Sequence, residues 1–228
     1  MKFGKFLWAG IFGILSCSAA ELVKDGKACS EIVVAEKADQ GTLEAAKDLQ
    51  LHLKKISGAE LKIVTPGKAQ SKNLICVGES SVTRNAGYKI PAFKTSGYDV
   101  FAKGNLVILT GASTNFKPVR SIYAGALHDQ NRLFSAATGT DENDCGPMHA
   151  VCAFLEYLGI RFYAPYEDGT VIPRKTSVKI PDFRETREAA FARRIYQYEG
   201  MEKDPEGMMW FKRLKTGSAL PPTGVFKM

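Results

Sequence analysis

The stretch from residue 31 to residue 65 constrains the fold most, because it places one amphipathic helix between two short apolar runs. Residues 31–35 and 61–65 have the length and composition of strands. Apolar side chains recur between them at helical spacing, at Ala45, Ala46, Leu49, Leu53 and Ile56. Asp39 is suited to cap the start of this helix, and Gly58 stands where a glycine commonly ends one. The stretch therefore predicts a strand, a capped helix and a second strand.

The rest of the domain continues this alternation. Further strands are expected at residues 73–77, 97–102, 106–110, 160–163, 170–172 and 177–180. A second helix is expected to begin at Pro147, where the missing proline N–H costs nothing, and to end at Gly159. This order predicts an α+β fold, an α/β sandwich in which a mixed β-sheet carries two main helices packed on one face. The domain is expected to close near Pro181.

The N-terminus has the pattern of a secretory signal peptide over residues 1–20. Lys2 and Lys5 precede an apolar run at residues 6–15, and small residues precede Glu21. We therefore expect a secreted or periplasmic protein. Cys17 also fits a lipid-attachment site, but ordinary cleavage before Glu21 is the favoured interpretation. No later run is long and apolar enough to predict a transmembrane segment.

The charge pattern argues against nucleic-acid binding. The chain has 31 Lys and Arg against 24 Asp and Glu, a net charge of +7, and two of these lysines lie in the expected leader. The remaining excess is spread along the chain without a compact basic patch that contains aromatic residues. A mildly basic exported protein is the simpler interpretation.

The cysteines and histidines predict no metal site or cofactor. Four cysteines follow the leader: Cys29, Cys76, Cys145 and Cys152. They have no CxxC spacing, so structural zinc is not expected, and their disulfide state stays open between pairing and buried free thiols, with the thiols favoured. His52 lies on the apolar stripe of the first helix and is interpreted as a packing residue, and His128 as a surface residue.

The passage FLEYLGIRFYAPYEDGTVIP, residues 154–173, is the candidate site, because aromatic and acidic side chains together are typical of sugar-binding proteins. Glu167 and Asp168 precede a glycine, which is a turn signature first. Phe162 and Tyr163 are expected to alternate on a strand, one inward and one outward. The passage is thus mainly a structural junction. Tyr163 and Tyr166 are kept as possible ligand or interface residues, and no catalytic residue is assigned.

The C-terminal part is expected to begin a second unit. Residues 183–188 are charged and read as a linker, residues 190–195 as a first strand and residues 205–214 as a first helix. The interpretation is a domain over residues 21–184, followed by a linker and the truncated start of another domain over residues 185–228. So short a piece cannot build an independent core. The polar segment at residues 111–145 is long for a compact domain, and its role stays open.

Several passages carry a resemblance to a known group of proteins. They are residues 31–35, 45–53, 56–61, 74–80, 97–100, 107–111, 154–165 and 171–173. Together they resemble the N-terminal domain that precedes the catalytic barrel in bacterial alpha-glucuronidases and family 20 beta-hexosaminidases. The resemblance implies a two-helix sandwich packed on a (β/α)₈ barrel. Such a barrel needs about 200 residues or more, which do not follow here, so no catalytic residue is carried over.

Two functions follow from the resemblance. The first is a non-catalytic N-terminal domain of an exported glycoside hydrolase, inactive alone, whose partner is the absent barrel. The alternative is a stand-alone carbohydrate-binding or partner-docking protein. A domain that normally meets a barrel is also expected to expose apolar side chains, with the candidates Phe183, Phe191, Ile195, Trp210 and Phe211.

Overall fold

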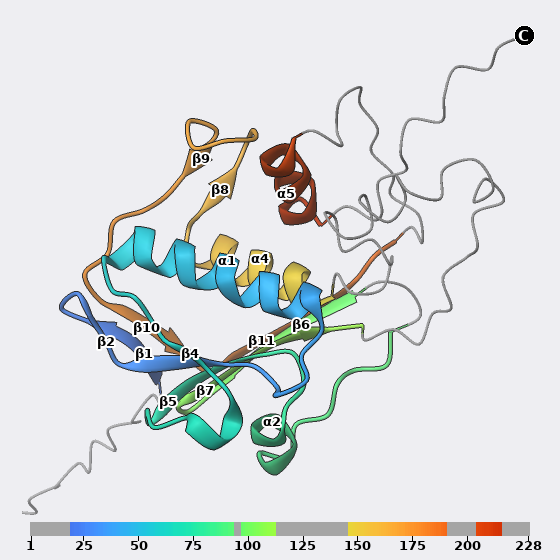
Figure 1. Cartoon of the computed structure of the whole chain (residues 1–228). Coiled ribbons are helices and arrows are strands. Elements are labelled where there is room, and N and C mark those ends of the chain that lie inside the picture. Colours follow the sequence, from blue (N-terminus) through green and yellow to red (C-terminus); the bar gives the residue numbers. More distant parts are fainter. Residues whose placement is uncertain (1–18, 94–96, 113–145, 191–203, 216–228) are drawn as a thin grey trace, which may run out of the picture.

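The computed structural model describes residues 19–93, 97–112, 146–190 and 204–215 (Figure 1). Several of the predicted features lie outside these residues. They are residues 1–18 of the leader with Cys17, the segment with His128 and Cys145, and the predicted strand residues Phe191 and Ile195.

A six-stranded mixed sheet forms the centre of the fold, in the order β11-β6-β7-β5-β3-β4. The strands are β3 (Ser30–Val33), β4 (Ile63–Val64), β5 (Asn73–Val77), β6 (Gly97–Lys103), β7 (Leu106–Gly111) and β11 (Phe183–Glu188). The four strands β7, β5, β3 and β4 run parallel, and β6 and β11 pair antiparallel at one edge. The predicted α+β class with a mixed sheet is confirmed.

Two helices cover one face of this sheet, α1 (Gln40–Ser57) and α4 (Gly146–Tyr157), as Figure 1 shows. Both ends of α1 follow the sequence signals. The Asp39 carboxylate accepts a hydrogen bond of 2.7 Å from the backbone N–H of Thr42, and Gly58 ends the helix in the left-handed region at φ 77°. The other face is covered by shorter pieces, η1 (Pro66–Lys68) and α2 (Ser81–Asn85).

Two small sheets complete the domain. The strands β1 (Ala19–Lys24), β2 (Lys27–Ala28) and β10 (Val178–Pro181) form one of them, and β8 (Arg161–Phe162) and β9 (Thr170–Val171) form a hairpin. The sequence did not predict β1. It begins two residues before the expected cleavage point, and Ala20 is fully buried opposite Ile180.

The prediction that residues 183–188 are a linker is wrong. They form β11, which pairs with β6 over its whole length, from Phe183 opposite Ala102 to Glu188 opposite Gly97. The prediction failed because β11 is an edge strand whose outward side chains are charged, which hides its alternation.

The C-terminal helix predicted at residues 205–214 is confirmed as α5 (Pro205–Arg213). It packs on α4, and its side chain Trp210 lies against the main core. Phe183 also packs on this core. These two side chains therefore do not form the exposed apolar surface that was expected, because α5 and β11 turn them toward the domain.

The thiols of Cys76 and Cys152 are free and buried, as favoured from the sequence, and Cys29 is free and half-buried. Burial raises the pKa of the Cys76 thiol to about 12. No helix in the described residues is long and apolar enough to span a bilayer. Nor does this part of the chain group three His, Cys, Asp or Glu side chains in a way that suits a metal ion.

Candidate functional site

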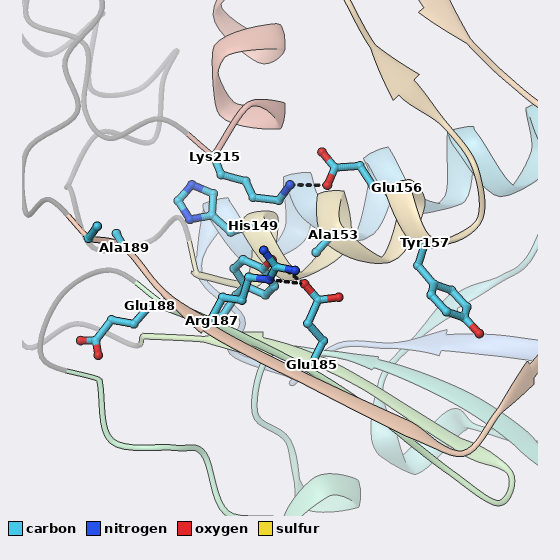
Figure 2. Close-up of a pocket in the computed structure, with 11 residues that line it drawn as sticks. His149, Ala153, Glu156, Tyr157, Glu185, Arg187, Glu188, Ala189 and Lys215 are labelled. Atoms are coloured by element: carbon cyan, nitrogen blue, oxygen red, sulfur yellow. Dashed lines mark hydrogen bonds and ion pairs between the residues drawn. The ribbon is translucent and has the colours of Figure 1, made fainter.

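A cleft of about 460 Å³ lies between α4 and β11 (Figure 2). Residues of β6, α4 and β11 line it, with residues that follow β11 and α5, and most of the lining side chains are charged or aromatic. The lining residues are Tyr98, His149, Ala153, Glu156, Tyr157, Glu185, Arg187, Glu188, Ala189, Ala190 and Lys215. This size is within the range of small-molecule sites.

The wall formed by α4 follows from helical spacing. His149, Ala153, Glu156 and Tyr157 are separated by four, three and one residues, so they share one face of the helix. Ala153 has only a methyl group at the centre of this face, and this leaves room for the cleft. His149 is buried at one end of this face.

The opposite wall is a hydrogen-bonded group on β6 and β11. The Tyr98 hydroxyl donates to Glu185 Oε1 at 2.9 Å, and Arg187 Nε donates to the same oxygen at 2.7 Å. Glu185 and Arg187 are two residues apart on β11, so both point to the same face of the sheet. Burial and the hydrogen bond to Glu185 together raise the pKa of the Tyr98 hydroxyl well above its usual range.

The upper edge of the cleft is closed by a second ion pair. Lys215, which follows α5, donates to Glu156 Oε2 of α4 at 2.5 Å. Figure 2 shows this pair facing Glu185 and Arg187 across the cleft, with Ala153 between them. At the other end, Tyr157 stacks on Phe183 with ring centroids 4.4 Å apart and remains half exposed.

This arrangement suits binding better than bond cleavage. Glu156 and Glu185 each hold a cation, so the two carboxylates act as acceptors in fixed ion pairs. Both walls offer hydrogen-bond acceptors and donors, in the form of carboxylates, cations and tyrosine hydroxyls. A ligand with many hydroxyl groups could use both, because a hydroxyl donates and accepts hydrogen bonds.

The structure places Tyr163 and Tyr166 outside this cleft, on the β8–β9 hairpin. Tyr163 is 73% exposed, and Phe162 before it is buried, as the predicted alternation requires. Tyr166 has a positive φ of 70°, and its hydroxyl donates to Asp204 at 2.9 Å. This hydrogen bond raises the pKa of the Tyr166 hydroxyl. Their role as ligand residues stays a prediction.

The acids of the hairpin have structural contacts. The backbone N–H of Thr170 donates to the Glu167 carbonyl at 3.1 Å, which closes the predicted turn. The Glu167 carboxylate pairs with Lys55 of α1, and this contact lowers its pKa. The hairpin is therefore tied to α1, in agreement with its interpretation as a junction.

Sequence reasoning missed Glu185 and Arg187 as site residues. The only signal was the alternation of residues 183–188, in which positions two apart share a face. Without a partner strand, that alternation of charged residues is indistinguishable from a solvated linker.

No protein-family model matches the chain, and no curated protein does. Solved structures do match. One is titled as a family GH115 4-O-methyl-alpha-glucuronidase with specificity for decorated arabinogalactans; the match has a TM-score of 0.58 at 12% sequence identity. It covers 89% of this chain and 26% of that structure, so the chain spans about a quarter of its length. The chain therefore has a fold related to part of a glycoside hydrolase, and this agrees with the coarser part of the resemblance.

Proposed function

We propose that the chain is a non-catalytic N-terminal domain of an exported glycoside hydrolase, which acts in carbohydrate breakdown together with a catalytic barrel. The observation that carries the proposal is the fold match, which covers nearly all of this chain but only 26% of an alpha-glucuronidase structure. The cleft between α4 and β11 adds support for a non-catalytic role. Its carboxylates Glu185 and Glu156 are held in ion pairs with Arg187 and Lys215.

The proposal predicts no turnover by this chain alone. The purified protein is assayed with an aryl alpha-glucuronide and an aryl N-acetyl-beta-hexosaminide, and no release of the aryl group is expected. Turnover that disappears in Glu185→Gln or Glu156→Gln would overturn the proposal, since it would place catalysis in the cleft. Sequencing downstream of codon 228 should also find barrel-coding sequence, and its absence would count against the proposal.

Export is part of the same proposal, on the evidence of the basic and apolar leader pattern at residues 1–20. Fractionation of the producing cell is expected to find the protein outside the cytoplasm. Labelling with a fatty acid separates free export from lipid attachment, because only attachment at Cys17 gives a label that Cys17→Ser removes.

Carbohydrate binding is the second candidate function. The observation that favours it is the cleft, with its two facing ion pairs and the half-exposed Tyr157 at one end. Glycan-array binding that Arg187→Ala abolishes and Tyr163→Ala preserves is expected if the cleft is the site. The reverse pattern would favour the hairpin tyrosines. An array without signal would remove this candidate.

A further inference from the structure

The last described helix, α5, lies against an acidic surface on α1 and α4. We define the acidic docking surface as Glu44 and Asp48 of α1 with Glu156 of α4. The facing side chains are basic and come from the last turn of α5 and from the second residue after it: Lys212, Arg213 and Lys215. Figure 1 shows α5 above α1 and α4, on the side away from the central sheet.

Each acid of the acidic docking surface is paired with one base. Lys212 Nζ lies 2.9 Å from Glu44 Oε2, and Lys215 Nζ contacts Glu156 Oε2. Arg213 binds both oxygens of Asp48, with Nη2 at 2.6 Å and Nε at 3.3 Å. Such two-point contacts fix direction as well as distance, because the guanidinium is planar.

An apolar contact lies beside the charges. The Trp210 indole Nε1 donates to the Phe162 carbonyl at 3.1 Å, and its ring packs on the main core. The Arg213 guanidinium lies 5.1 Å from the centre of the Phe162 ring, within cation–π range. Helix α5 thus presents one apolar and one basic side to the domain.

Asp48 is a buried acid that pairs with Arg213 of α5 and also lies 3.5 Å from Nδ1 of His52 on its own helix. Its side chain is only 4% exposed, on the buried part of α1, four residues before the buried His52. A buried carboxylate is costly unless it is paired and hydrogen-bonded. Arg213 supplies that pairing from a position 165 residues further along the chain.

We propose that the acidic docking surface is a binding site for a basic amphipathic helix, and that its occupant is α5 of the same chain. By this contact α5 holds the chain at Lys215 against α4, where Lys215 also forms one edge of the cleft. The proposal goes beyond the proposed function and does not depend on a catalytic partner.

Hydrogen exchange of the wild-type protein gives the first test. A free helix of nine residues is unstable in water, so slow exchange of the α5 amides reports docking. We expect the amides of residues 209–214 to exchange at least about tenfold more slowly than those of an unstructured peptide. Exchange at the unstructured rate would overturn the proposal.

Fluorescence gives the second test, because Trp210 is the only tryptophan besides Trp8 of the expected leader. In the variant Lys212→Gln/Arg213→Gln we expect the emission of Trp210 to shift to longer wavelength and acrylamide quenching to rise about twofold. Lys54→Gln is the control, since it removes a lysine of α1 from its exposed pair with Glu60 and should leave the spectrum unchanged. Identical spectra for the double variant and the control would overturn the proposal.

Far-UV circular dichroism checks that the double variant keeps its fold. Should it unfold, the single variant Lys212→Gln takes its place, and the exchange test on the wild type still decides. Light scattering identifies the occupant. A monomer is expected, whereas a dimer that the same substitutions dissociate would overturn docking within one chain and assign the surface to the α5 of a second copy.

Discussion

Asp99 of β6 and Arg184 of β11 form an ion pair of 3.0 Å in which the carboxylate is fully buried and the guanidinium is half exposed. The same carboxylate accepts hydrogen bonds from the hydroxyls of Tyr88, at 2.6 Å, and Thr186. Three segments thus share one acid, and two of the donors come from the strand that had been interpreted as a linker. Asp99 thus adds side-chain contacts to the backbone pairing that joins β11 to β6.

Replacing Asp99 by Ala is expected to lower the free energy of unfolding by about 3 kcal/mol, because it leaves the partner groups without their acceptor. Urea denaturation measures the change. Asp168→Ala is the control, because Asp168 is exposed, and it should change stability by less than about 0.5 kcal/mol. Equal stabilities of the two variants would contradict the role given to Asp99.

Gly111→Ala is expected to destabilise the protein by about 3 kcal/mol. An added Cβ at Gly111 would lie 2.4 Å from the Gly146 Cα and 2.4 Å from the Gly97 carbonyl oxygen. Both are backbone atoms, so the end of β7 and the start of α4 would have to move apart. Thermal unfolding checks this. Gly67→Ala is the control, because nothing lies within 4 Å of its added Cβ, and it should be neutral or slightly stabilising.

The buried His52 is expected to make stability depend on pH. Burial lowers the pKa of His52 in the folded state below its ordinary value of 6.5, although Asp48 opposes this. The folded state then binds fewer protons than the unfolded state as the pH falls below about 6.5, so stability is full above that pH and declines below it. Denaturation between pH 7.5 and pH 5 measures the decline.

His52→Gln is the matched variant for this dependence. Glutamine does not titrate, so the variant should lose less stability between pH 7.5 and pH 5 than the wild type does. Parallel curves for the two proteins would contradict the prediction. Carboxylates with lowered pKa values, such as Glu31, act only at lower pH, because their contribution is lost below about 4.5.

A chain that begins at Glu21 is expected to be about 1 kcal/mol less stable than one that begins at Ala19. The shorter chain loses the pairing of Ala19 with Pro181 and of Ala20 with Ile180, and Ala20 is fully buried. Urea denaturation of the two forms gives the difference. Equal stability of the two forms would contradict the role given to these two pairings.

The sequence by itself determined those helices and strands whose stabilising contacts lie between residues close together in the chain. Asp39, the apolar repeat of α1 and Gly58 act within one helix, so that element could be predicted with both of its ends. The β6–β7 hairpin and the inward and outward sides of Phe162 and Tyr163 follow from the same kind of short-range rule. From these the α+β class with two helices on one face also followed.

Only the tertiary structure decided the rest, because the deciding partners are far apart in the chain. β11 is a strand because β6 lies beside it, and Asp48 is tolerated in α1 because Arg213 reaches it from α5. The cleft exists only where α4, β11 and Lys215 come together. A sequence shows which residues are charged, but which charges neutralise one another is fixed by the folding of distant segments onto a common surface.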